Sequence, residues 1–283
     1  IHRTGYILKT QANPGYLELV EINNFNPDKI ESLMKRCSIC INLIGILFEK
    51  KKGHFNQIHT DLPNLISHLA NKFNIEKLIH LSALGIEEAS DSLYAKSKLE
   101  GEKKIVKNFS NSIILRPSIV YSIDDNFTTR FMKLLSMFPI MPIYYNGKTK
   151  FSPIHVSDIV NIICKMVENK NKSLILECVG PEVLSFKDII KILLNSINKK
   201  RLLLPLPIPI ANISAKILQL FPQPLLTEDQ LKLLKYDNIK TGNYKNNIDL
   251  KLGAKKKFKD EIEKYSYNWR AGGQFSNINN VVN

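Results

Sequence analysis

The order of predicted elements along this chain indicates an α/β fold built on a doubly wound parallel sheet. Short apolar runs, of the kind that form strands buried on both faces, alternate with longer segments of helical periodicity. Glycines and polar residues follow the carboxyl ends of these runs, which is the edge where open α/β sheets bind ligands. We therefore expect a ligand-binding sheet with helices on both faces.

Strands are expected where apolar side chains form short runs or alternate with polar ones, and helices where good helix formers recur with a period near 3.6. The expected order is a strand at 17–21, a helix at 28–36, a strand at 40–45, a helix at 55–73, a strand at 77–81 and a helix at 91–107. A strand near 174–178 should return to the same sheet.

A serine, a tyrosine and a lysine stand where a nicotinamide-dependent reductase would hold its catalytic groups. Ser82 follows the strand at 77–81, while Tyr94 and Lys98 share one face of the next helix. A phenol has a reference pKa of about 10, so it needs a nearby cation such as Lys98 to exchange a proton at neutral pH. Ser82 would then hold a substrate carbonyl while Tyr94 exchanges the proton and the nicotinamide the hydride.

The Tyr-x-x-x-Lys spacing alone is not specific in a lysine-rich chain. It also occurs at Tyr144/Lys148 and Tyr236/Lys240. The predicted strand and helix around Tyr94 favour that copy, and an exposed helical pair without function is the alternative interpretation.

Six sequence blocks occur in the order found in atypical and extended short-chain dehydrogenase/reductases. They are Asn42–Gly45, Ile79–Gly85, Tyr94–Lys98, Leu115–Val120, Pro153–Asp158 and Gly180–Phe186. The chain resembles this superfamily over nearly its whole length. Within it the chain is most similar to the NADPH-binding accessory subunits of respiratory complex I and their bacterial relatives, through the segments 42–47, 203–207, 226–231 and 267–275.

This resemblance implies a Rossmann-type fold with a smaller carboxyl-terminal lobe. Residues 1–116 would form the NAD(P)-binding domain and residues 117–283 the second lobe, which partly returns to the sheet. It implies NADPH as the cofactor, with NADH less favoured. The residues expected to bind it are Arg3, Asn42, Leu43, Ile44, Gly45, Ser82, Tyr94, Lys98, Pro117, Ser118 and Ile119.

Two of these positions carry a specific expectation. Gly45 ends a strand and would let the backbone approach an adenine ribose closely, although a plain turn glycine is the alternative. Arg3 matches a basic residue beside the adenosine 2′-phosphate, which favours NADPH; a solvated arginine is the alternative.

The sequence departs from the superfamily at its start. The glycine-rich turn that brings a pyrophosphate to a helix amino terminus is not found, and residues 1–5 match the end of the second strand and the loop after it. We therefore expect that the first strand, its glycine turn and the first helix are missing, and that the chain is a fragment.

The preferred role is a cofactor-holding subunit of respiratory complex I, in which NADPH is mainly structural. Its partners would be other complex I subunits, on the cytoplasmic face of a bacterial inner membrane or on the mitochondrial matrix side. The alternative is a free NADPH-dependent reductase or epimerase of a sugar-nucleotide, isoprenoid or quinone precursor. Both roles would retain Ser82, Tyr94 and Lys98, so these residues do not decide whether the protein is an enzyme. A membrane-binding or structural protein without cofactor is a weaker third reading.

A formal charge of +14 suggests anionic partners. Nucleic acid is disfavoured because lysine far outnumbers arginine and no arginine and aromatic stripe occurs. Peripheral contact with an anionic membrane is expected at residues 208–221, an apolar helical face flanked by basic residues 199–201; a lobe-packing helix is the alternative. Prolines interrupt residues 202–226, which excludes a spanning helix there.

We predict no metal site. Cys37 and Cys40 have metal-like spacing, but no second close cysteine pair exists, and the histidines form no credible ligand set. Four cysteines in this length of chain suit a reducing compartment.

Overall fold

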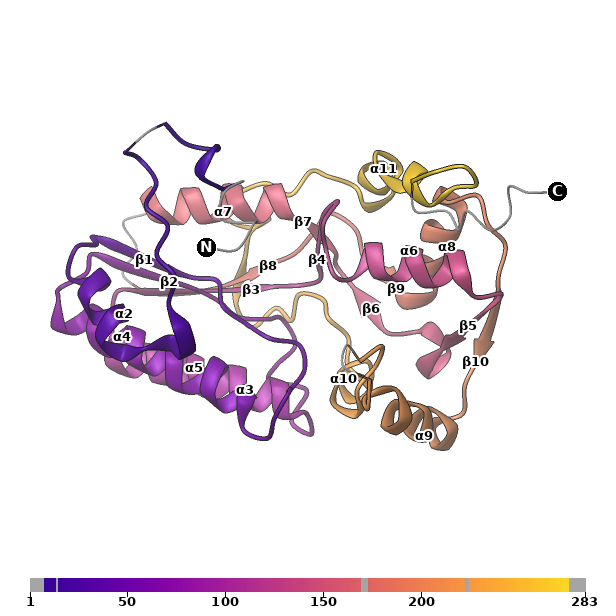
Figure 1. Ribbon diagram of the computed structural model, residues 1–283, viewed down its shortest axis with the longest axis horizontal. Coiled ribbons are helices and arrows are strands. Elements are labelled where there is room, and N and C mark those ends of the chain that lie inside the picture. Colours follow the sequence, from indigo (N-terminus) through magenta and orange to yellow (C-terminus); the bar gives the residue numbers. More distant parts are fainter. Residues whose placement is uncertain (1–7, 14, 169–172, 222–223, 275–283) are drawn as a thin grey trace.

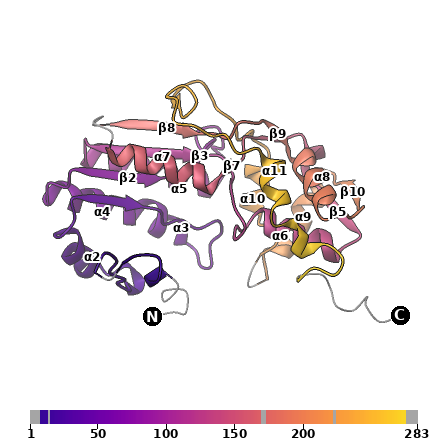
Figure 2. The ribbon, with the colours of Figure 1, turned by 90° about the horizontal axis from the view of Figure 1, so that it is seen from above.

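The computed structural model describes residues 8–13, 15–168, 173–221 and 224–274. A parallel sheet with its covering helices lies at one end of the molecule, and a second part, rich in helices, lies at the other (Figures 1 and 2). The fold is the expected α/β, Rossmann-type arrangement.

The central sheet has the strand order β1-β2-β3-β8-β11. Its strands are β1 (Ile39–Asn42), β2 (Lys77–Leu81), β3 (Ser112–Pro117), β8 (Leu174–Cys178) and β11 (Lys245–Asn246). Every neighbouring pair is parallel. The carboxyl ends of β1, β2 and β3 therefore meet at one edge of the sheet.

Helices cover both faces of this sheet (Figure 1). One face carries α2 (Pro27–Met34), α4 (Leu62–Lys72) and α5 (Leu93–Asn108), and the other carries α7 (Val156–Glu168). Neighbouring strand residues point to opposite faces. Leu78 therefore packs in the cluster that contains α4, and Ile79 packs in the cluster that contains α7.

Among its described residues, the second part contains five longer helices and three small strand pairs. The helices are α6 (Thr128–Met137), α8 (Phe186–Ser196), α9 (Ile208–Leu218), α10 (Glu228–Leu233) and α11 (Phe258–Glu263). The strand pairs are β4 (Val120–Tyr121) with β7 (Ile154–His155), β5 (Ile140–Ile143) with β10 (Leu202–Pro205), and β6 (Lys150–Phe151) with β9 (Leu184–Ser185). Aromatic side chains including Tyr121, Phe186 and Phe258 form its core.

Short helical turns complete the chain. They are η1 (Asn23–Phe25), α3 (His54–Asn56), the π-helical turn η2 (Gln57–Asp61), η3 (Tyr144–Gly147) and η4 (Ser266–Trp269). No helix within the described ranges is both long enough and apolar enough to cross a membrane.

Most expected elements are present, with two differences. The strand expected at 17–21 is not formed, because these residues pair with no strand among the described ones and an extended segment needs a ladder partner. The helix expected at 55–73 is divided into α3, η2 and α4. The boundary at residues 116 and 117 falls inside the end of β3, and β8 and β11 return to the sheet; the division into two domains stays a prediction.

Candidate functional site

The expected site residues gather at the carboxyl edge of the central sheet. Asn42 is the last residue of β1, Ser82 directly follows β2 and Pro117 ends β3. Because these three strands are parallel neighbours, the loops that follow them lie side by side. Helix α5 adds Tyr94 and Lys98 from one face of the sheet.

Lys98 of α5 contacts the end of β2 and lies close to the loop after β1. Its Nζ donates a hydrogen bond of 3.1 Å to the carbonyl of Leu81, the last residue of β2. A Cβ placed on Gly45 would lie 3.3 Å from the same Nζ, so the loop after β1 passes directly over the ammonium group. The Lys98 side chain is buried, and this burial lowers its pKa to about 8, while the Glu102 carboxylate acts in the opposite direction. Most Lys98 side chains therefore remain charged at neutral pH.

Tyr94 lies beside Lys98 in a different setting from the one expected. Its ring packs edge-on against His59 at 5.2 Å and Phe55 at 5.8 Å between ring centroids. Burial raises the pKa of Tyr94 to about 12. Burial alone sets the direction of this shift, and the expected help of Lys98 to the phenol stays a prediction. The phenol therefore stays protonated at neutral pH.

Ser82 has a buried hydroxyl for which the described residues provide no hydrogen-bond partner. Its backbone amide is held by the carbonyl of Leu115 at 2.7 Å, so the position of the residue is fixed. A buried polar group without a partner costs about 1–3 kcal/mol. Such a group is usually satisfied by an ordered water or by a bound molecule.

Asn42 shapes the loop after β1. Its Oδ1 accepts a hydrogen bond of 3.1 Å from the amide of Ile44, and its Nδ2 lies 3.1 Å from Nδ1 of His80. Burial lowers the pKa of His80 well below its usual range, so this ring is neutral. The loop then presents Leu43 and Ile44 to solvent, with 56% and 40% of their surfaces exposed.

Comparisons with known proteins agree with this geometry. Residues 87–224 match the family described as RmlD substrate binding domain. A solved dTDP-4-dehydrorhamnose reductase from Bacillus anthracis, in complex with NADP, shares 15% identity, and the alignment covers 92% of this chain and 94% of that one with a TM-score of 0.65. The chain is therefore similar to extended short-chain dehydrogenase/reductases, in residues 87–224 by family and over most of its length by fold.

Two curated relatives that the chain is similar to carry the name NADH dehydrogenase [ubiquinone] 1 alpha subcomplex subunit 9, mitochondrial. The protein of Dictyostelium discoideum is 26% identical over 98% of this chain and 78% of its own length. The protein of Mus musculus is 23% identical over 82% of this chain and 62% of its own length.

Sequence reasoning missed His59, which the π-helical turn η2 directs toward the site. The amide of Ile46 donates to His59 Nε2 at 3.1 Å, so the neutral ring carries its proton on Nδ1. That nitrogen donates to Ser97 Oγ at 3.0 Å, and Ser97 donates to the carbonyl of Tyr94 at 2.8 Å. Burial and the charge of Lys98 lower the pKa of His59 to about 3, which keeps the ring neutral. A π-helical turn is frequent at functional sites but has no simple sequence signal.

The segment after β3 borders the site, although its polar groups are engaged within the protein. The Pro117 carbonyl accepts from the amide of Leu84 at 2.9 Å, and the Ile119 carbonyl accepts from the first residue of β7 at 2.9 Å. The Ser118 hydroxyl lies 2.6 Å from Asn238 Oδ1 and donates to it. A cofactor role for this segment stays a prediction.

Helical context distinguishes the three Tyr-x-x-x-Lys copies as expected. Tyr94 and Lys98 share α5. The copy at 144–148 spans the irregular turn η3, and the copy at 236–240 follows α10 without helical structure. Neither of the latter pairs therefore shares a helical face. Arg3 lies outside the described residues.

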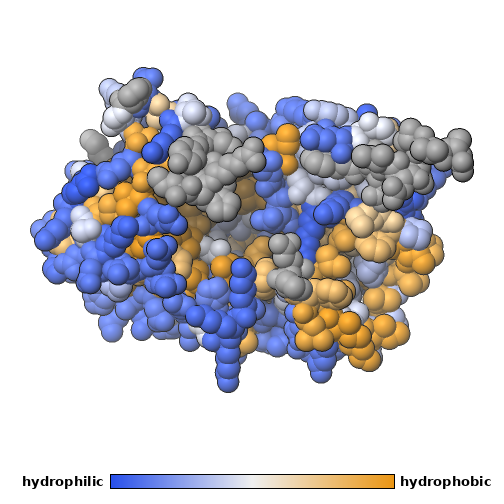
Figure 3. All heavy atoms as spheres, in the orientation of Figure 1, coloured by the Kyte–Doolittle hydropathy of each residue, from blue (hydrophilic) through white to orange (hydrophobic). Residues whose placement is uncertain are grey.

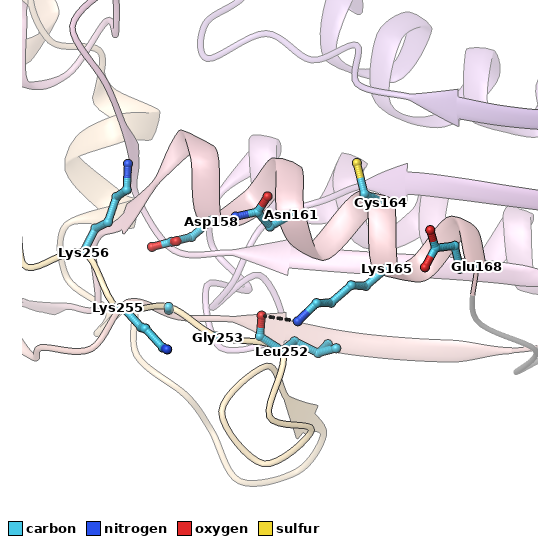
Figure 4. Close-up of a pocket in the computed structure, with 10 residues that line it drawn as sticks. Asp158, Asn161, Cys164, Lys165, Glu168, Leu252, Gly253, Lys255 and Lys256 are labelled. Atoms are coloured by element: carbon cyan, nitrogen blue, oxygen red, sulfur yellow. Dashed lines mark hydrogen bonds between the residues drawn. The ribbon is translucent and has the colours of Figure 1, made fainter.

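One cavity lies away from these residues, on the opposite face of the sheet. It has a volume of about 570 Å³ and lies between α7 and residues 252–256, where Lys165 donates to the Leu252 carbonyl at 3.3 Å (Figure 4). A smaller cavity of about 280 Å³ lies near the start of α5, between Phe55 and α10. Among the described residues, no group of three or more His, Cys, Asp or Glu side chains has the geometry of a metal site.

Proposed function

We propose that the protein holds NADPH at the carboxyl edge of its sheet and serves as an accessory subunit of respiratory complex I, where the cofactor is mainly structural. The named relatives support the complex I assignment. Since the chain spans 62% to 78% of their length, the role of the whole protein is part of the proposal.

The observation that carries the cofactor proposal is the convergence of Lys98, Gly45 and Ser82. A charged ammonium beneath a glycine backbone suits the ribose hydroxyls and negative charge of a dinucleotide. The unpartnered Ser82 hydroxyl offers a hydrogen bond to a bound group. When bound, the nicotinamide would supply hydride chemistry. The finer choice of NADPH over NADH rests on Arg3 and its fit to a 2′-phosphate.

A holding role is favoured over turnover by the state of Tyr94. At a pKa of about 12 almost no phenolate is present at neutral pH to accept a proton, and the protonated phenol is a weak donor, so proton exchange is disfavoured in both directions. The second candidate is a reductase or epimerase, which the retained set of Ser82, Tyr94 and Lys98 supports. The two proposals differ in whether the bound cofactor reacts.

Calorimetric titration of the intact protein with NADPH and NADH tests this proposal. We expect NADPH to bind more tightly, and to stabilise the protein by about 2.7 kcal/mol at a hundredfold excess over its Kd. We also expect co-purification with complex I subunits and no turnover. Failure to bind either dinucleotide would refute the proposal. Oxidation of NADPH at roughly 1 per second or faster with a small carbonyl substrate would favour the reductase instead.

We further propose that the protein contacts an anionic bilayer, on the mitochondrial matrix side or the cytoplasmic face of a bacterial membrane. Exposed apolar side chains gather on α9 and on the β5–β10 pair, toward the lower right of Figure 3. They include Ile140, Leu202, Leu204, Ile208, Ile210, Ile213, Ile217, Leu220 and Phe221. An apolar patch of this kind marks an interaction surface.

Charge favours a lipid surface as its occupant. The two segments that carry this patch, residues 138–151 and 197–221, contain six lysines and arginines and no aspartate or glutamate, and Lys216 pairs with Glu228 of α10 at 3.8 Å. Basic side chains around an apolar helical face are typical of proteins that lie on anionic membranes, where each contributes about 1 kcal/mol. A protein that bound at the same place would need an acidic surface of its own.

Vesicle flotation tests the membrane contact. The intact protein should float with phosphatidylcholine vesicles that contain phosphatidylglycerol, and Ile213→Asp should abolish this. Val160→Asp is the control, because Val160 is similarly exposed at 50% but lies on α7. Equal flotation of the wild type with and without the anionic lipid, or equal loss in both variants, would contradict the proposal.

A further inference from the structure

One stretch of the second part contacts the three loops that follow β1, β2 and β3 at the carboxyl edge of the sheet. We define the strap as residues 227–238, which comprise α10 and the turn that follows it. The strap contains most of the segment 226–231 that the family resemblance singled out. The residues that it contacts near the sheet lie between 120 and 183 positions away in the sequence.

The first contact holds the start of α5, the helix that carries Tyr94 and Lys98. Asp229 Oδ1 accepts a hydrogen bond of 2.7 Å from the amide of Leu93, and its Oδ2 accepts from the amide of Tyr94 at 3.0 Å. The buried hydroxyl of Ser92 also donates to Oδ2 at 2.8 Å. A carboxylate at a helix amino terminus satisfies free amides and suits the helix dipole. Asp229 therefore fixes the helix end beside the site.

Further contacts reach the loops that follow β1, β2 and β3. Gln230 donates to the Leu47 carbonyl at 3.3 Å in the first loop. Asn238 donates to the Leu84 carbonyl at 2.7 Å in the second loop and accepts from Ser118 at 2.6 Å in the third. Between these points, Leu233 and Tyr236 pack in the same apolar cluster as Tyr94.

We propose that the strap is a positioning element for the dinucleotide site, with Asp229 and Asn238 as its two fixed points. It fixes the positions of α5 and the three loops relative to one another. In this way it also fixes the positions of Lys98, Gly45 and Ser82. The strap does not itself contact the reacting atoms. This inference rests on the proposed cofactor-holding function, and it makes affinity for the cofactor depend on the second part of the molecule.

Hydrogen exchange of the cofactor-free intact protein tests the strap independently of binding. In Asp229→Ala, the amides of Ile46 and Leu84 should exchange faster, although neither amide touches Asp229; they donate to His59 and Pro117. The matched control is Ser185→Ala, which removes the cap of α8 in the second part. Faster exchange confined to Leu93 and Tyr94 would show a local helix cap and overturn the proposal.

Calorimetric titration with NADPH provides the second readout. Asp229→Ala and Asn238→Ala should each weaken NADPH about tenfold, whereas Ser185→Ala should lower thermal stability without changing Kd. If Asp229→Ala does not fold, Asp229→Asn replaces it in this experiment. The asparagine keeps one acceptor oxygen, so this variant should fold and lose less affinity for NADPH than the roughly tenfold loss expected of alanine. Unchanged Kd in the Asp229 variants would overturn the proposal. If the wild type binds no NADPH, the cofactor function fails and the exchange experiment alone decides the strap.

Discussion

Replacing Lys98 with methionine should stabilise the cofactor-free protein while weakening its affinity for NADPH. Burial lowers the pKa of Lys98 from 10.5 to about 8. At 1.36 kcal/mol for each pKa unit, this difference means that the charged ammonium destabilises the fold by about 3 kcal/mol. The methionine loses the bond to the Leu81 carbonyl, which is worth about 1 kcal/mol. The net gain is about 2 kcal/mol, or roughly 4 °C in Tm for a chain of this size.

The gain should depend on pH in a defined direction. The folded pKa of Lys98 lies below its unfolded value, so the unfolded state binds more protons between about pH 8 and 10.5. The destabilisation is therefore complete below about pH 8 and is lost as the pH rises through this window. The stability difference between Lys98→Met and the wild type should shrink accordingly.

Urea unfolding of both proteins between pH 7 and 10 measures this difference, and calorimetry at pH 7 measures the accompanying loss of NADPH affinity. A variant that is less stable than the wild type at pH 7, by an amount that does not change with pH, would refute the reasoning from burial. NADPH affinity of the wild type should also fall above about pH 8, where Lys98 loses its charge.

Three further predictions concern the same site. Arg3→Ala should weaken NADPH by about 1.5 to 3 kcal/mol in calorimetry and leave NADH unchanged, because only NADPH carries the 2′-phosphate; equal losses would contradict its assignment. Lys148→Ala and Lys240→Ala should leave the Kd of NADPH unchanged, and losses as large as that of a Lys98 variant would show that helical context does not distinguish the three Tyr-x-x-x-Lys pairs. His59→Phe keeps a ring but leaves the Ile46 amide without its partner, so it should cost about 1–3 kcal/mol in urea unfolding and weaken NADPH; unchanged values would exclude a role in fixing this loop.

The parts of the fold that follow from local pattern are predictable from the sequence. The strand at 77–81 has the expected bounds, because a short run rich in apolar residues is buried in β2. Helix α5 brings Tyr94 and Lys98 together because a four-residue spacing places them on one face. The segment at 17–21 shows the limit of this reasoning, since an alternating pattern forms a strand only when a partner strand is present.

The features that escaped prediction depend on contacts between distant residues. Asp229 meets Tyr94 across 135 positions, and no periodicity indicates such a pair. The π-helical turn at His59 has no sequence signal of its own. The raised pKa of Tyr94 comes from burial of the phenol, which residue spacing alone does not indicate.

Quantifying the nucleotide that accompanies the intact protein tests the central claim most directly. The tagged protein is purified from its own cells under mild detergent, its bound nucleotides are released and identified, and the co-purifying proteins are determined. The account predicts about one NADPH for each copy of the protein, together with subunits of complex I. A free soluble protein that carries no nicotinamide dinucleotide, or one that turns NADPH over at roughly 1 per second or faster, would contradict it.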